Sequence, residues 1–286
     1  MKFWQSLQFT PTEQLVPLAR ALEETAFHGA FLGDHSLHPQ QLTTPYPYTP
    51  DGKVLWPADT HWPDISSVFG AFANATRRLH FMSSIMILPL RHPFEIAKML
   101  ATVSVLSDNR AALGIGLGWM EDEFRALGID FASRAKRCDE MIEVMRLLWT
   151  GAMVEYHGQH FDFPPSQLAP TPVGRVPVYI GGDSPAALRR AARSGDGWIS
   201  SGLSAEAVPK QVATLQRLRA EAGRSREPFE VIATLPADLQ LIRQMRDGGI
   251  TAVCNVSTLD EIAGRTSLAD RIGTIRRYAD EIIARL

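Results

Sequence analysis

Short apolar runs that lead into helical patterns recur about eight times along the chain, and this repetition limits the possible folds most. The clearest unit spans residues 111–149. Its run from Ala111 to Leu117 contains no charge, so it reads as a strand buried on both faces, as in a parallel sheet. A glycine-rich exit follows, and acidic residues at 121–123 open a helical stretch. Eight such strand–helix units predict a (β/α)8 TIM barrel.

The predicted strands and helices alternate through the whole sequence. We expect strands at 2–9, 29–35, 79–88, 111–117, 176–180, 195–201, 229–235 and 251–256. Helices are expected at 15–22, 64–75, 94–106, 121–149, 185–194, 205–222, 237–247 and 268–286. A barrel needs about 250 residues, so 286 residues with 45% hydrophobic content predict one α/β domain, 1–286. Two irregular stretches, approximately 36–64 and 152–175, are predicted insertions at strand–helix loops.

Polar residues stand where two of the early strands end. Asp34 and His35 close the second strand, and in a parallel barrel such positions face the active site. The same pair could instead be a loop cap or turn. Arg91 and His92 follow the third strand. They would meet an anionic group or pair with a carboxylate across the rim, and ion pairing is the expectation for His92.

The two insertions differ in composition. Stretch 36–64 carries four aromatic rings, at positions 46, 48, 56 and 62, which argues against disorder. It is either a substrate-side lid or wall, or an ordered crossover packed on the barrel rim or against another subunit. Stretch 152–175 contains two short alternating runs around Gly158, which predict a hairpin. Its histidines, His157 and His160, are not in a metal-ligand pattern, and we expect no metal site.

A second glycine-rich exit follows the strand at 176–180. Ser184 before Pro185 fits a helix N-cap with proline in the first turn. Backbone N–H groups of such a loop, with the helix dipole, can bind an anion, and barrels often hold phosphate near late loops. The alternative is an ordinary strand–helix turn.

The glycines at 114, 116 and 118 also allow two interpretations. They resemble part of the dinucleotide fingerprint G-x-G-x-x-G. That fold would need an acidic residue at the end of a second strand about 20 residues on, and none is present. The favoured interpretation is a barrel strand whose open end lets a flat ring lie against the backbone.

Composition argues against several classes of protein. The net charge is −2 and no basic stripe is present, so a nucleic-acid partner is not expected. The two cysteines, Cys138 and Cys254, lie far apart and suit packing in a reduced, cytoplasmic protein. We expect no signal peptide and no membrane span. Nor does the chain contain G-x-S-x-G or H-E-x-x-H, so no protein nucleophile is proposed.

The segment LGIGLGW, followed by EF, ALGI, an Arg and a helix ending in LLW, resembles the bacterial luciferase-like superfamily. The resemblance covers most of the chain and is densest at 28–200. It implies a flavin- or deazaflavin-dependent oxidoreductase on a (β/α)8 barrel. The elements YPYTPDG and WP point to the probable F420-dependent branch.

The resemblance also implies roles for particular residues. Asp34 would lie beside the deazaflavin, and His35 would act in acid/base chemistry. A non-prolyl cis peptide between Ser84 and Ile85 would back the middle ring of the cofactor. The fourth strand exit would contact the ring, and the later glycine loop its phosphate; these residues are Gly116, Gly118, Trp119, Gly181, Gly182 and Ser184.

One position departs from the family pattern. Sugar-phosphate and alcohol dehydrogenases of the family use an acid or base near the fourth strand exit, where this chain has Trp119. An indole donates one hydrogen bond and does not exchange a proton usefully, so sugar-phosphate oxidation is not expected. Trp119 would instead shape an apolar pocket or pack on the rim. Glu121 or Glu123 could replace the acid, although a solvated helix start explains both more simply.

Three functional hypotheses follow from the resemblance. The leading one is F420-dependent hydride transfer with a small, apolar organic substrate. The second is an FMN-dependent monooxygenase that uses reduced flavin and O2, and the third is a non-catalytic flavin-binding protein. The resemblance also implies a homodimer and a flavin or F420 reductase as a possible partner.

Overall fold

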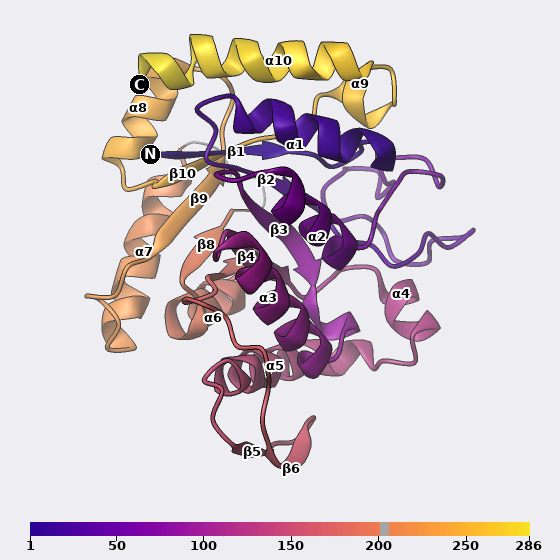
Figure 1. Cartoon of the computed structure of the whole chain (residues 1–286), viewed down its shortest axis with the longest axis vertical. Helices are drawn as coiled ribbons and strands as arrows, with labels where there is room; N and C mark the ends of the chain where they lie inside the picture. Colours follow the sequence, from indigo (N-terminus) through magenta and orange to yellow (C-terminus); the bar gives the residue numbers. More distant parts are fainter. Residues whose placement is uncertain (201–205) are drawn as a thin grey trace.

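In the computed structural model, which describes residues 1–200 and 206–286, eight parallel strands close into a barrel (Figure 1). Around the barrel the strands run in the order β1-β10-β9-β8-β7-β4-β3-β2. Their bounds are β1 (Lys2–Ser6), β2 (Gly29–Leu32), β3 (His80–Ile87), β4 (Ala111–Gly116), β7 (Val178–Gly181), β8 (Gly197–Ile199), β9 (Glu230–Thr234) and β10 (Ala252–Asn255). The predicted TIM barrel is therefore confirmed.

Helices follow the strands and form the outer layer of the barrel (Figure 1). The longer ones are α1 (Leu15–Glu23), α2 (Ile65–Ala75), α3 (Pro93–Ser107), α5 (Arg134–Leu148), α6 (Pro185–Ser194), α7 (Val208–Glu221), α8 (Leu239–Asp247) and α10 (Leu268–Glu281). Two short helices, α4 (Glu121–Ala126) and α9 (Leu259–Ile262), lie in loops after β4 and β10. No helix of the described residues is long and apolar enough to cross a membrane.

The core has two layers, as a barrel requires. Inside the barrel, side chains from the strands form one buried cluster: Trp4, Phe31, Met82, Ala112, Tyr179, Ile199, Ile232, Ala252 and Cys254. A larger cluster fills the space between the strands and the helices. Strands buried on both faces explain why the apolar runs in the sequence are nearly continuous rather than alternating.

Most predicted boundaries agree with the structure within a few residues; the second strand ends at Leu32 rather than at residue 35, and three further boundaries differ. The first strand ends at Ser6 rather than at residue 9, because Phe9 already adopts a positive φ of 57°. The helical stretch predicted at 121–149 is interrupted after Ala126, where Gly128 has a φ of 68°. The closing helix ends at Glu281 and a 3-10 turn follows. Residue 201, the predicted end of the sixth strand, and residue 205, the predicted start of the sixth helix, lie outside the described residues.

Both insertions are visible. The predicted hairpin forms from β5 (Val154–His157) and β6 (Asp162–Ser166), an antiparallel pair outside the barrel (Figure 1). Residues 33–64 contain neither helix nor strand and extend along the barrel rim. Because β4 pairs with β3 and β7 in a closed barrel, the dinucleotide-binding interpretation of its glycines is wrong.

Candidate active site

A cavity of about 760 Å³ opens at the carboxyl ends of the barrel strands. All ten residues that the sequence singled out line it: Asp34, His35, Ser84, Ile85, Gly116, Gly118, Trp119, Gly181, Gly182 and Ser184. They come from four strand ends that are distant in sequence. The predicted convergence at one barrel face is confirmed, whereas the binding role of each residue stays a prediction.

His35 is held by a carboxylate that sequence reasoning assigned to the surface. Its Nδ1 lies 3.0 Å from Glu123 Oε2, and the other oxygen of Glu123 accepts the Ser36 N–H at 2.6 Å. Glu123 is fully buried. The interpretation of Glu123 as part of a solvated helix start is therefore wrong.

Asp34 is also fully engaged by its neighbours. One carboxylate oxygen accepts from Arg91 at 2.7 Å, and the other accepts from the Ile87 N–H at 3.1 Å. Burial raises the pKa of Asp34, while Arg91 and the Ile87 N–H act in the opposite direction. Asp34 thus ties the end of β2 to the loop after β3, and Arg91 forms the expected ion pair across the rim.

His92 does not pair with a carboxylate, so that expectation is wrong. Its side chain accepts the Phe94 N–H at 3.3 Å and caps the start of α3. The ring also packs edge-on against Phe94 and Phe161. A histidine ring can cap a helix in this way because a neutral ring nitrogen accepts a hydrogen bond.

Aromatic rings from the first insertion and from the exit of β4 surround His35. Trp62, Trp56 and Trp119 lie with ring centroids 4.8, 5.5 and 6.2 Å from the imidazole. Tyr46 packs edge-on against Trp56 and Trp119 at 5.3 and 5.1 Å. These rings, with Tyr48, line the cavity. Insertion 36–64 therefore forms a wall of the site together with Trp119, and we call Tyr46, Tyr48, Trp56, Trp62 and Trp119 the aromatic wall.

The first turn of α4 anchors this insertion. Asp122, which is only 8% exposed, accepts hydrogen bonds from the backbone and side chain of both Thr43 and Thr44. These bonds, the one from Thr43 Oγ1 above all, lower the pKa of Asp122. Sequence reasoning assigned no role to Asp122 and favoured a solvated position for Glu123, because an acidic first helical turn usually faces solvent.

The strand β3 bulges beside the cavity, and the bond between Ser84 and Ile85 is cis, as the family resemblance implied. The Ile85 side chain fills the space above two glycines. A Cβ on Gly116 would lie 2.5 Å from Ile85 Cδ1, and one on Gly181 would lie 2.8 Å from Ile85 Cγ2. The glycines therefore make room for Ile85, and a flat ring would rest on this side chain rather than on bare backbone.

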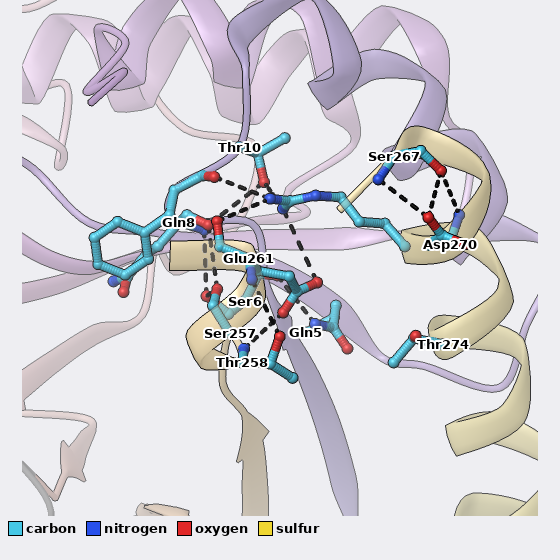
Figure 2. Close-up of polar contacts among 12 residues, drawn as sticks. Gln5, Ser6, Gln8, Thr10, Ser257, Thr258, Glu261, Ser267, Asp270 and Thr274 are labelled. Atoms are coloured by element: carbon cyan, nitrogen blue, oxygen red, sulfur yellow. Dashed lines mark hydrogen bonds and ion pairs between the residues drawn. The ribbon is translucent and has the colours of Figure 1, made fainter. Parts of the chain in front are cut away.

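A polar network around Gln8 holds the bulge, and Figure 2 shows the part of it that joins Gln8 to Ser6 and Ser257. Gln8 Nε2 donates to the Ser84 carbonyl at 2.8 Å. The Gln8 carbonyl accepts from Ser257 Oγ at 3.1 Å, and the Gln8 N–H donates to Ser6 Oγ at 3.2 Å. The ends of β1 and β10 are thus tied together behind Gln8, which fixes its amide against the bulge.

The glycine loop after β7 is also fixed. Its Gly182 carbonyl accepts from Trp198 Nε1 at 2.8 Å, and the Gly182 N–H already donates to the Ile199 carbonyl. Ser184 caps α6 by accepting the Ala187 N–H at 3.2 Å, which confirms the predicted N-cap. Pro185 has no N–H, so ahead of Ala187 the first turn has only the Ala186 N–H, which has no partner within the helix and remains available to an anion.

One basic side chain near this loop escaped sequence reasoning. Arg190 is 7% exposed and is the only Lys or Arg among the described residues that line the cavity. Its Nε lies 2.6 Å from Asp139 Oδ1, so its charge is shared with a carboxylate. A position two turns into α6 gave no signal in the sequence, because a basic helix residue usually faces solvent.

Comparison with known proteins places this architecture in a family. The profile of the luciferase-like monooxygenase family matches residues 4–238, and the chain belongs to that family. An uncharacterized protein of Mycobacterium tuberculosis is 32% identical over 290 residues, and the match covers 100% of both chains. The F420-dependent glucose-6-phosphate dehydrogenase of Microbacterium testaceum is 31% identical over 79% of this chain and 64% of its own length.

Two solved structures have the same fold. Monooxygenase RslO1 of Streptomyces bottropensis superimposes with a TM-score of 0.79 at 20% identity, over 100% of this chain and 99% of its own. The F420-dependent tetrahydromethanopterin reductase of Methanopyrus kandleri gives 0.78 at 16% identity, over 99% of both chains. The chain is thus an oxidoreductase of the luciferase-like family, in which F420-dependent and flavin-dependent enzymes both occur.

Proposed function

We propose that the protein is an F420-dependent oxidoreductase that transfers hydride to or from a small, uncharged, largely apolar organic substrate. The observation that carries this proposal is the placement of His35 between the bulge at Ile85 and the aromatic wall. A proton-handling group, a platform for a ring and an apolar compartment meet there. When bound, the deazaflavin would give the hydride to the substrate or accept it from the substrate.

The residues present fit this cofactor. A cavity of about 760 Å³ lies within the range of about 300–1,000 Å³ that is usual for small-molecule sites. Ile85 and Ser84 would support the ring, with Gly116, Gly118 and Trp119 beside it. The glycine loop at 181–184 would hold the phosphate with the free N–H at the start of α6.

The charge near the loop favours F420 over FMN. A phosphomonoester such as that of FMN carries a charge of about −1.5 to −2 at pH 7, whereas the phosphodiester of F420 carries one negative charge. Arg190 is the single cation lining the cavity within the described residues, and Asp139 already neutralises part of it. The undescribed residues 201–205 include no Lys or Arg. This weakly positive site suits the smaller charge.

The alternative is an FMN-dependent monooxygenase that uses reduced flavin and O2. The family as a whole and the similarity to monooxygenase RslO1 favour it. A non-catalytic flavin-binding protein is a further alternative. It would have no need for the buried carboxylate that holds His35.

The aromatic wall supports an apolar substrate. Its indole and phenol rings are large and mostly apolar, and they would exclude water from the space beside His35. Arg190 is buried at the other end of the site, so the wall presents no cation that would bind a second phosphate. Glucose 6-phosphate is therefore not proposed as a substrate, although a relative that is 31% identical to this chain is named as a glucose-6-phosphate dehydrogenase.

The roles of His35 and Asp34 follow from their contacts. His35 would give a proton to a carbonyl oxygen during reduction, or accept one from a hydroxyl during oxidation. Asp34 would act from the cavity wall as a fixed charge beside the ring, held by Arg91 and Ile87. A homodimer and a reductase partner remain predictions from the family resemblance, and a cytoplasmic location remains a prediction from the cysteines.

The substitution His35→Ala tests the enzyme hypothesis. We expect this variant to bind F420 with affinity close to that of the native protein, because the imidazole does not form the ring platform or the phosphate loop. Turnover of a neutral ketone with reduced F420 should fall about a hundredfold or more, since general acid–base groups contribute about 10²–10⁴-fold. Full activity of this variant would refute the proton-handling role.

A further inference from the structure

We propose that Glu123 is a positioning residue, which holds the His35 imidazole in the tautomer that carries hydrogen on Nδ1 and presents Nε2 to the cavity. The inference rests on the proposed function, because it gives His35 a defined proton-transfer atom. It gives Glu123 a different role from the one that the sequence left open, in which this side chain would itself replace the family's acid.

Hydrogen-bond chemistry carries the first step. An ionised carboxylate only accepts hydrogen bonds, so the contact of 3.0 Å between Glu123 Oε2 and His35 Nδ1 requires the hydrogen to lie on Nδ1. The other oxygen of Glu123 accepts the Ser36 N–H at 2.6 Å, next in sequence to the histidine. Both oxygens of the carboxylate are therefore used to fix the position and rotation of this ring.

Because Glu123 is buried and His35 is largely buried, these two side chains have few other partners. Glu123 is fully buried, and a buried carboxylate is costly unless its oxygens are paired. The His35 side chain is only 10% exposed. Within the described residues its Nε2 has no hydrogen-bond partner, and solvent can reach this atom. The free nitrogen therefore opens into the cavity that His35 lines.

The surroundings add few competing charges. Asp34 lies close enough to interact electrostatically with both His35 and Glu123, and Arg91 balances it through their ion pair. Tyr46 belongs to the aromatic wall, and burial raises the pKa of its phenol, so it stays neutral near pH 7. Glu123 is thus the only charged group in direct contact with the imidazole among the described residues.

This arrangement predicts how the reaction depends on pH. The negative charge of Glu123 stabilises the imidazolium that forms when Nε2 takes a proton. Without that charge the imidazolium that forms during proton transfer is less stable. Ketone reduction consumes the proton that Nε2 gives to the substrate, so its rate declines as the pH rises. The declining limb of the pH profile should therefore move to lower pH in Glu123→Gln.

The experiment compares Glu123→Gln with Asp122→Asn. Both replace a buried carboxylate in the same turn of α4, but Asp122 accepts its hydrogen bonds from Thr43 and Thr44 of the insertion. We would measure kcat for a neutral ketone with reduced F420 between about pH 5 and 9, together with the Kd for F420. For Glu123→Gln we expect the limb to move down by about one pH unit or more, kcat at pH 7 to fall about tenfold, and Kd to change less than about threefold.

In Asp122→Asn the declining limb of the pH profile should lie at the same pH as in the native protein, even if the rate changes. A native pH profile in Glu123→Gln would overturn the proposal, as would an equal displacement in both variants. If F420 does not bind the native protein at all, the proposed function fails instead, and the two failures are distinguishable.

A second measurement needs neither activity nor a folded Glu123 variant. Nitrogen-15 NMR of the native protein with labelled histidine reports the tautomer of each neutral ring, and His35→Gln identifies the signals of this residue. Hydrogen on Nδ1 with an unprotonated Nε2 at high pH supports the proposal. Hydrogen on Nε2 would overturn it, whatever the cofactor.

Discussion

His35 Nδ1 and Glu123 Oε2 lie 3.0 Å apart, although 88 positions separate the two residues in the chain. The pair joins the end of the second barrel strand to the short helix after the fourth. In a parallel barrel such contacts form at the carboxyl-terminal face, where catalytic groups from different strands meet. This contact connects the fold to the proposed chemistry, because it leaves one imidazole nitrogen facing the cavity.

The space above Gly116 gives the first prediction. The substitution Gly116→Ala would place a Cβ 2.5 Å from Ile85 Cδ1 and so displace the side chain on which the cofactor ring would rest. We expect the affinity for F420 to fall about tenfold or more, measured by quenching of cofactor fluorescence. Adding Ile85→Val removes the clashing methyl group and should recover part of the affinity.

Gly70→Ala is the matched control for that variant. Gly70 lies in α2, and an added Cβ there would meet no atom within 4 Å, so this change should leave cofactor affinity unaltered. It should also stabilise the protein by up to about 1 kcal/mol through helix propensity. Equal cofactor affinity in Gly116→Ala and the native protein would contradict the ring placement.

The glycine loop gives the second prediction. Ser184→Ala removes the N-cap of α6, and Ser267→Ala removes the N-cap of α10, far from the cavity. Each should destabilise the protein by about 1 kcal/mol in urea unfolding. Only Ser184→Ala should weaken F420 binding, by about threefold to tenfold, because its helix start would hold the phosphate. Similar cofactor affinity in both variants would return the loop to the role of an ordinary turn.

Substrate choice gives the third prediction. With F420 as acceptor, a neutral secondary alcohol such as cyclohexanol should be oxidised with a kcat/KM about a hundredfold or more above that for glucose 6-phosphate. Trp119 stands at the fourth strand exit, and the aromatic wall offers no cation to the sugar phosphate. The initial rates of both oxidations are measured from the loss of F420 absorbance. Efficient oxidation of glucose 6-phosphate would refute the assignment of an apolar substrate.

Two stacked histidines at the opposite end of the barrel give the fourth prediction. The ring centroids of His28 and His80 lie 4.3 Å apart, and burial, with the neighbouring charges of His80 and Lys2, lowers the pKa of His28 to about 3. Burial also lowers the pKa of His80, with Lys2 and Arg110 contributing. Both rings are thus neutral in the folded protein at neutral pH, while in the unfolded chain they take up a proton near about pH 6.5.

The unfolded state therefore binds more protons between about pH 6.5 and about pH 3, and stability is lost as the pH falls through that window. From about pH 6.5 to about pH 5 the His28 contribution amounts to about 2 kcal/mol. Urea unfolding at several pH values measures the slope, and His28→Phe should flatten it. A slope in His28→Phe that equals the native one would contradict this assignment.

The sequence predicted the barrel because each strand–helix unit is locally consistent. Continuous apolar runs, glycine-rich exits and N-caps such as Ser184 are short-range signals, and they correspond to strands, loops and helix starts in the structure. It also predicted which residues meet at the cavity, because the carboxyl ends of parallel strands share one face.

Contacts between distant segments were not predictable in the same way. Glu123 and Asp122 look like an exposed helix start, and only the folded insertion shows that Ser36, Thr43 and Thr44 cover them. The role of Gly116 was predicted as an open backbone, whereas Ile85 from the neighbouring strand fills that space. Loop conformation decides such contacts, and loops of this length carry little local pattern.

The most direct test of the central claim is equilibrium binding of oxidised F420 and of FMN to the same purified protein, followed by fluorescence. The proposed function predicts F420 binding about tenfold or more tighter than FMN binding, because Arg190 shares its charge with Asp139 and suits a single negative charge. Tighter binding of FMN would contradict it and identify the flavin-dependent monooxygenase as the correct alternative.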